Sequence, residues 1–270
     1  MIAPKQLSNA EKQLIRLGLR LNPTVVIIGF AILMVTWSTL FQIPLIIYNL
    51  LLLPGFALLI AWFNYAGLAC VFLDEFIPHD IPERKFAKAL KALEAEAVKI
   101  QQLGFEEIDR FYVKTRFDLI ELVFKHQHEN IALSLLCFVG RATYISLSTE
   151  LNNEVLVTTS SVKLSNFPRP STSYLQTLGN TDHYLLLEAH KDAIEIFVDH
   201  GYSPVDMFQE PWRSRFLRLE RYFIRYIMTI PFWALKMYFW VFTKPGKKYQ
   251  VTIREQLARQ IIQIPRLNSF

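Results

Sequence analysis

Two histidines two positions apart, His126 and His128, have the spacing that most clearly permits chemistry in this 270-residue chain. In an extended strand such side chains share one face, so both imidazoles could bind a metal ion with Glu129 beside them. Zinc requires three or four ligands, and only a fold that brings His183 or His190 to this point could complete the set. Surface or half-buried histidines explain the pattern more simply, so we predict no bound metal and no cofactor.

Other reactive side chains lack the neighbours that catalysis needs. The hydroxyl-rich segment TTSS, residues 158–161, could supply a nucleophile, but no base can be assigned to it. Asp74, Glu75 and Asp80 could act as general acids or metal ligands toward a lipid, although a solvated linker explains them more simply. The chain contains no Walker loop and no G-x-G-x-x-G, H-E-x-x-H or G-x-S-x-G motif, so we predict no catalytic residue.

The two cysteines, Cys70 and Cys137, fall in a predicted membrane helix and a predicted strand. Two thiols in such places suggest neither a disulfide nor a zinc cluster. We predict that both are small buried hydrophobic side chains. Palmitoylation of Cys70 near the membrane face is the alternative.

An uncharged segment dominates the first third of the chain. No Lys, Arg, Asp, Glu or His occurs between Arg20 and Asp74. A bilayer crossing needs about 20 apolar residues, and a helix in a soluble core would have a polar face. The sequence therefore predicts a transmembrane helical hairpin over 24–73, with spans at 24–42 and 48–72.

The stretch WSTLFQIPLIIYN, residues 37–49, is the predicted turn of this hairpin. Pro44 disfavours a continuous helix, and the side chains of Thr39, Gln42 and Asn49 could reach interfacial water. Pro54 could kink the second span, because membrane helices tolerate proline.

Charge predicts the orientation and the partners. Residues 1–23 carry net +3 and basic residues follow the second span, so the positive-inside rule places both termini in the cytoplasm. Residues 74–212 carry net −8, whereas residues 213–270 carry net +10. Basic charge beside apolar segments is typical of contact with anionic lipids. We therefore predict a lipid bilayer as partner, and no nucleic acid.

Residues 74–211 predict a cytoplasmic α+β domain made of a helix, an antiparallel sheet of four to five strands and a second helix. The first helix follows Asp80 as N-cap, ends at Gly104 and has apolar residues at helical spacing. Those residues are Phe86, Leu90, Leu93, Ala97 and Ile100. Alternating strands follow, with hairpin turns predicted at 126–130 and at Asn152-Asn153, and the second helix ends at Gly201.

Residues 212–270 predict a basic tail of amphipathic helices on the membrane surface. The predicted membrane contacts are Arg218, Arg221, Arg225, Phe223, Trp233 and Trp240. Pro231 should bend or end the helix. For residues 226–242 an interfacial or re-entrant segment is favoured over a third span or a core helix, because the run contains Lys236 and a span would export basic residues. Residues 252–264 predict a short helix that could bind a partner.

Four segments carry a resemblance to a known group: LGF (103–105), YISLSTELNNEVLVTTSS (144–161), FPRP (167–170) and YLLLEAHKDAI (184–194). Their order after an apolar hairpin is similar to that in a group of uncharacterised bacterial membrane-anchored proteins. The resemblance covers roughly residues 100–200 and implies a bacterial inner membrane. It implies no activity, cofactor or catalytic residue.

The sequence thus predicts a multi-pass membrane protein that presents a cytoplasmic α+β domain for binding or scaffolding. A protein partner could bind this domain or the C-terminal helix. The alternative is a membrane-interface enzyme or sensor that acts on a lipid or small ligand.

Overall fold

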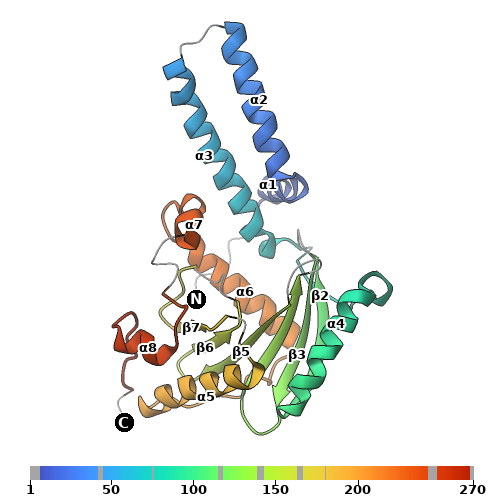
Figure 1. Cartoon of the computed structure of the whole chain (residues 1–270), viewed down its shortest axis with the longest axis vertical. Helices are drawn as coiled ribbons and strands as arrows, with labels where there is room; N and C mark the ends of the chain where they lie inside the picture. Colours follow the sequence, from blue (N-terminus) through green and yellow to red (C-terminus); the bar gives the residue numbers. More distant parts are fainter. Residues whose placement is uncertain are drawn as a thin grey trace. The chain divides into compact units, whose positions relative to one another are not determined.

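A computed structural model describes residues 7–41, 45–74, 76–114, 118–138, 143–162, 167–179, 181–242 and 248–267 (Figure 1). The chain divides into a helical unit, Met1–Phe76 with Met228–Tyr238, and an α+β unit, Ile77–Ile227 with Phe239–Phe270. The prediction of an α+β fold is confirmed.

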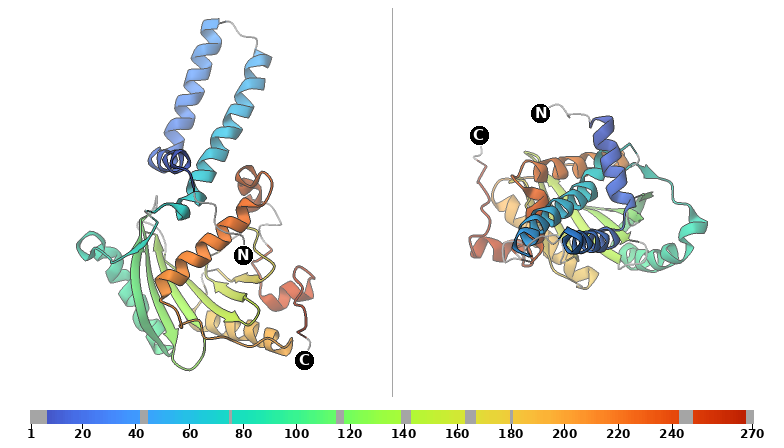
Figure 2. Two further views of the ribbon diagram at one scale, coloured as in Figure 1. Left: turned by 180° about the vertical axis from the view of Figure 1, so that it is seen from behind. Right: turned by 90° about the horizontal axis from the view of Figure 1, so that it is seen from above.

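The helical unit contains α1 (Asn9–Arg20), α2 (Pro23–Phe41), α3 (Leu45–Ala69) and the short 3-10 helix η1 (Cys70–Phe72). α1 begins with a capping box, in which the Ser8 and Glu11 side chains each accept a hydrogen bond from the other residue's backbone. The chain bends by 92° between α1 and α2. α2 and α3 then run side by side, with the Phe30 and Phe56 rings 5.4 Å apart (Figures 1 and 2).

The predicted hairpin turn over 37–49 is shorter than expected, because α2 continues to Phe41 and α3 begins at Leu45. Thr39 bonds back to the carbonyls of Val35 and Thr36, 3.2 and 2.8 Å away, as hydroxyls within helices often do. Gln42 and Pro44 lie outside the described residues. Pro54 lies inside α3, which continues through it.

The α+β unit is built on one sheet in the order β1 to β7. Its strands are β1 (Pro78–His79), β2 (Phe105–Val113), β3 (Leu119–His126), β4 (Ala132–Phe138), β5 (Thr143–Leu151), β6 (Val155–Ser160) and β7 (Ser173–Thr177). Every pairing is antiparallel except that of β6 with β7, which is parallel.

The predicted count of four to five strands is therefore wrong. The strands expected from alternation correspond to β2 through β6. β1 has only two residues, and β7 follows Pro168 and Pro170 in a segment that looks like a loop. A parallel pairing also requires a return crossover rather than a tight turn. Neither edge strand carries enough local periodicity to be recognised.

The turn between β5 and β6 also differs from the two-residue hairpin predicted. Leu151 pairs with Val155, so the loop has three residues. Positive φ occurs at Asn153 and Glu154, both at 59°. The predicted turn near 126–130 is confirmed, because β3 ends at His126 and β4 begins at Ala132.

Helices cover both faces of the sheet (Figure 2). α4 (Glu83–Gln102) and α5 (His183–Asp199) pack on one face. The other face receives α6 (Trp212–Met228), whose Phe216 ring lies 5.3 Å from that of Phe111. The middle strand β3 is buried on both sides accordingly, apart from partly exposed Lys125.

The apolar stripe predicted for α4 is confirmed, because all five of its residues are buried in the core. The predicted N-cap is wrong. Pro82 occupies that position, and no side chain caps the helix. The Asp80 carboxylate instead accepts a hydrogen bond from Arg213 of α6, at 2.8 Å. Asp80 thus forms an ion pair with a residue far along the chain and does not cap the helix.

The tail is divided into shorter helices. α6 ends at Met228 and α7 (Trp233–Phe242) begins after Pro231, as predicted for that proline. The break separates the 226–242 run that could have formed a third span. α8 (Ile253–Ala258) is shorter than the predicted 252–264, and its buried Ile253 belongs to the core cluster beside β7.

The contact of α1 with α3 generates a testable prediction. A Cβ atom at Gly18 would lie 2.5 Å from the Cβ of Ala66, whereas one at Gly29 would meet nothing within 4 Å. We expect Gly18→Ala to destabilise the protein by about 1–3 kcal/mol, because the close approach would overpack the helices. Thermal unfolding in detergent would measure this, with Gly29→Ala as the matched control. Equal stability of the two variants would contradict the packing described.

Candidate membrane interface and polar sites

Apolar side chains of α2 are exposed, and those in the described part of α3 before Ala66 are exposed or half-buried. Leu58 of α3 is 72% exposed, and several side chains of α2 are also exposed. Those of α2 are Val25, Ile28, Ile32, Leu33, Val35 and Trp37. Such a continuous apolar surface is typical of contact with a membrane or another protein.

One helical stretch among the described residues, Pro54–Phe72, is long and apolar enough to cross a bilayer. The bent pair of α1 and Pro23–Trp37 would count as a second only if its two arms formed one span. Only 22% of this apolar stretch is buried by other parts of the chain. A core helix of a soluble protein would be mostly buried.

The residues predicted to contact the membrane surface are mostly engaged with protein groups. Arg218 pairs with Glu210, and the Phe223 ring lies 5.0 Å below the guanidinium of Arg169. Trp233 is buried, with its ring 6.0 Å from that of Tyr65. The Trp240 ring lies 6.3 Å from that of Phe167. The last predicted contacts, Arg221 and Arg225, lie in the second half of α6.

The inner side of α6 is attached to the sheet by polar as well as apolar contacts. Arg215 is buried and pairs with Glu150 of β5. The Trp212 indole donates a hydrogen bond to Glu121 of β3 over 3.4 Å. The amphipathic pattern predicted as a membrane surface thus also serves to cover the sheet, and periodicity alone cannot distinguish the two.

Glu121 is a buried carboxylate beneath α6, with an exposed fraction of 2%. Its Oε1 atom accepts hydrogen bonds from Ser134, at 2.6 Å, and from Trp212. Its Oε2 atom has no hydrogen-bond partner among the residues that the structure describes. Burial raises the pKa of Glu121 to about 7, so this side chain changes charge near neutral pH.

A second buried polar group centres on His190 of α5, which is 0% exposed. Its Nδ1 atom lies 2.8 Å from Thr159 Oγ1, and its Nε2 atom lies 3.0 Å from Thr149 Oγ1. Gln176 donates to Thr159 over 2.8 Å, and Thr149 donates to the carbonyl of Asn130 over 3.2 Å. One arrangement of hydrogen atoms satisfies all four of these hydrogen bonds: Thr159 donates to Nδ1, and neutral His190 donates from Nε2 to Thr149.

The cluster extends to the C-terminal region, because Gln176 accepts a hydrogen bond from the backbone of Ile253, at 2.8 Å. Sequence reasoning assigned no base to the TTSS segment, whereas the fold brings His190 to Thr159. His190 itself is fully buried, whereas Thr149 and Asn130 line the larger pocket described below. The arrangement connects α5 and α8 with the three strands β5, β6 and β7 and with the turn between β3 and β4.

The remaining histidines do not converge with His190. The His126 and His128 rings lie 6.2 Å apart, and burial lowers the pKa of His126. Glu129 pairs with Lys191 at 2.7 Å, and His183 lies 3.0 Å from a Glu96 oxygen. Among the described residues, no group of three or more His, Cys, Asp or Glu is placed to hold a metal ion.

The cysteines and the acids near residue 74 have ordinary environments. Cys70 and Cys137 are both buried, which confirms that prediction, and the Cys70 thiol donates to the carbonyl of Gly67 over 3.1 Å. Asp74 pairs with Lys12 at 2.8 Å. Asp80 belongs to the pocket described next, and Glu75 lies outside the described residues.

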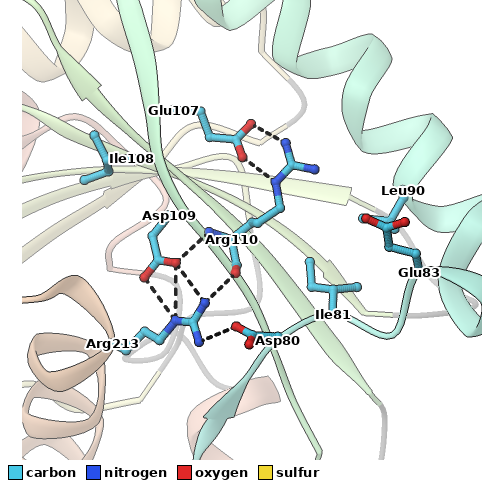
Figure 3. A pocket seen from close by; sticks show the side chains of 9 residues that line it. All are labelled: Asp80, Ile81, Glu83, Leu90, Glu107, Ile108, Asp109, Arg110 and Arg213. Atoms are coloured by element: carbon cyan, nitrogen blue, oxygen red, sulfur yellow. Dashed lines mark hydrogen bonds and ion pairs between the residues drawn. The ribbon is translucent and has the colours of Figure 1, made fainter.

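A pocket of about 420 Å³ opens beside β2, along the part of this strand that the two-residue β1 does not pair with (Figure 3). Arg213 lies between two carboxylates and donates to Asp109 over 3.1–3.2 Å and to Asp80 over 2.8 Å. Arg110 binds Glu107 through two hydrogen bonds, of 2.6 and 3.0 Å. Two arginines are therefore already matched by three carboxylates.

The same part of β2 contains a β-bulge between Glu107 and Asp109. Bulges and charged side chains protect an edge strand from pairing with another chain. The ion pairs thus hold the start of α6 and the segment before α4 against a protected edge. Glu83 of α4 also lines the pocket.

A larger pocket of about 860 Å³ lies beside α5 and the turn between β3 and β4. Its apolar lining includes Ile131, Ile194, Val198 and Pro204. Its charged lining includes Glu129, Glu188, Lys191, Asp192 and Glu195, so acidic residues are in excess. This combination suits binding of a positively charged apolar segment better than binding of an anion.

Neutral burial of His190 predicts a pH dependence. Burial lowers the pKa of His190 from 6.5 to about 3. Between these values the unfolded chain binds a proton that the folded chain does not, so stability falls as the pH is lowered, by about 1.4 kcal/mol per unit. We expect His190→Gln to lose this slope and about 1–3 kcal/mol at neutral pH. Chemical unfolding over a pH series would measure both, with exposed His128→Gln as control. An unchanged slope in His190→Gln would contradict neutral burial.

Glu121 predicts the opposite trend. Its pKa rises from 4.5 to about 7, so the folded chain retains a proton that the unfolded chain releases between these values. Its contribution to stability is therefore full below pH 4.5 and is lost as the pH rises through 7. We expect Glu121→Gln to unfold at a higher denaturant concentration than the native protein at about pH 8. The matched control is exposed Glu106→Gln, and a destabilised Glu121→Gln at this pH would refute the assignment.

The chain matches no protein-family model, no curated protein and no solved structure. The resemblance drawn from residues 100–200 stays a prediction. Assignment of the sites therefore depends on the exposure, charge and hydrogen bonding described above.

Proposed function

We propose that this chain is an integral multi-pass membrane protein that holds its α+β unit at the cytoplasmic surface as a binding or scaffold module. The observation that carries the proposal is the exposed apolar surface of α2 and α3. Water disfavours each fully exposed large apolar side chain by about 1.5–3 kcal/mol relative to burial. A bilayer removes this cost wherever it covers the exposed apolar side chains of these helices.

Helix lengths support insertion. α2 has 19 residues and α3 has 25. At about 1.5 Å per residue, these helices extend roughly 28 and 38 Å, against a hydrocarbon core of about 30 Å. Backbone polar groups inside a helix are satisfied internally, as a bilayer requires.

Basic residues on both flanks support cytoplasmic termini. The resemblance drawn from residues 100–200 favours a bacterial inner membrane. Anionic lipids suit the basic flanks, and a protein partner suits the large pocket beside α5, where acidic residues surround an apolar lining.

The alternative of a membrane-interface enzyme or sensor draws support from the carboxylates that converge on the smaller pocket (Figure 3). Arg110 and Arg213 bind Glu107, Asp80 and Asp109. Each of these three carboxylates already accepts hydrogen bonds from an arginine, so none of them is left open to bind a ligand. The binding or scaffold module is therefore the better proposal for this unit.

Topology provides the decisive test. We expect alkaline carbonate to leave the full-length protein in the membrane pellet, and detergent to release it. In intact cells, an impermeant maleimide should label Gln42→Cys but neither Ser8→Cys nor Glu188→Cys. All three should react after permeabilisation, which is the control for reactivity. Carbonate release, or labelling of only one of the two predicted cytoplasmic positions, would overturn the proposal.

A further inference from the structure

Two segments from opposite ends of the chain pack against the same turn of α3, at Trp62–Ala66. α1 contacts this turn through Gly18, whose Cβ position would lie 2.5 Å from Ala66 and 3.7 Å from the Trp62 ring. Residues at the start of α7 contact it through a 2.7 Å hydrogen bond from Asn64 Nδ2 to the carbonyl of Ala234. A polar side chain of α3 is thus satisfied by protein at this level.

The environment of α3 changes at the same turn. Residues before it are exposed or half-buried along the described part of the helix. Ala66 at the end of this turn is buried, and so are Ala69, Cys70 and Val71 after it, whereas Gly67 is exposed. The helix therefore passes from an apolar surface that faces outward into contact with its own chain.

The direction of α1 agrees with an interface at this level. Because α1 is bent by 92° from α2, it would lie parallel to a bilayer that α2 crosses along the normal. Leu14 and Leu17 are 52% and 48% exposed on its outer side. Gln13 and Arg20 are exposed beside Leu17, whereas Lys12 and Arg16 are half-buried and Lys12 is held by Asp74. A helix whose exposed side carries leucines beside a basic residue can lie in a membrane interface.

Phe232 adds an independent observation from the other segment. Phe232 is 78% exposed, and its backbone has a positive φ of 57°. A bulky residue rarely adopts positive φ, and such a conformation costs roughly 1–3 kcal/mol. Neighbouring contacts of Trp233 and Ala234 with α3 hold this conformation. Phenylalanine is one of the apolar side chains that membrane-interface segments bury at the boundary of headgroups and acyl chains.

We propose that α1 and residues 229–235 form an interfacial collar, with Leu14, Leu17 and Phe232 as its outer side chains, which seats in the headgroup boundary of the bilayer. The collar sets the depth of the hairpin. This proposal rests on the proposed membrane insertion. It moves the end of the second membrane span from residue 72, as the sequence predicts, to near Trp62. From Leu45 to Trp62 the helix extends roughly 26 Å, which suits a core of about 30 Å.

Fluorescent probes on single introduced cysteines would test the collar in the full-length protein. The protein would be reconstituted in nanodiscs of phosphatidylcholine and phosphatidylglycerol that carry a nitroxide quencher either near the headgroup or at the end of the acyl chain. Leu14→Cys, Leu17→Cys and Phe232→Cys report on the collar. Ile32→Cys lies near the middle of α2 and reports on the hairpin, and exposed Glu188→Cys of α5 reports on solvent. The native cysteines are buried.

We expect the collar probes to be quenched by about twofold more with the headgroup quencher, because an interfacial helix lies roughly 5–10 Å into that boundary. The probe at Ile32 should be quenched more by the nitroxide at the end of the acyl chain. The probe at Glu188 should be quenched by neither nitroxide. Quenching at Ile32 without quenching at the collar would overturn the collar and leave the membrane proposal intact. Failure of quenching at Ile32 as well would overturn both. Three collar positions on two segments ensure that one poorly folded variant does not decide the result.

Discussion

The exposed apolar surface of α2 and α3 is the constraint on which the rest of the structure depends. Residues 21–73 contain no Lys, Arg, Asp, Glu or His, so neither helix has a charged face to turn toward water. The described side chains of these helices are not covered by other parts of the chain over most of their length. Other elements of the helical unit contact the hairpin near the C-terminal end of α3. Gly18 of α1 and Ala234 at the start of α7 do so at one turn of α3.

The α+β unit solves a different problem, because a sheet buried on both faces must satisfy every polar group that it encloses. On one face His190 is kept neutral by burial and forms a continuous set of hydrogen bonds with two threonines and a glutamine. On the other face Glu121 has one oxygen without a partner among the described residues. Lowering the pH reduces the stability that His190 contributes, and raising the pH reduces the stability that Glu121 contributes. The two groups therefore give the unit opposite pH dependences of stability.

α6 shows how one amphipathic pattern can serve two surfaces. Its basic and aromatic residues are those of a membrane-surface helix. Yet Arg213 and Arg215 bind carboxylates of the α+β unit, and Trp212 reaches Glu121. Arginine suits such sites, because its planar guanidinium can bind several acceptors at once. Large exposed side chains remain on both units, Leu14, Leu17 and Phe232 on the helical unit and Tyr222 on α6.

Local pattern by itself determined much of this protein. The absence of charge predicted the two apolar helices, helical spacing predicted α4 and α5, and alternation predicted β2 through β6, because each signal lies within one element. Only the tertiary structure decided the rest. The parallel pairing of β7, the exchange of an Asp80 cap for an ion pair with Arg213, and the meeting of Thr159 with His190 all join residues far apart in the chain. Whether α6 covers a sheet or a membrane is equally undecided by periodicity, since both surfaces present the same apolar face to the helix.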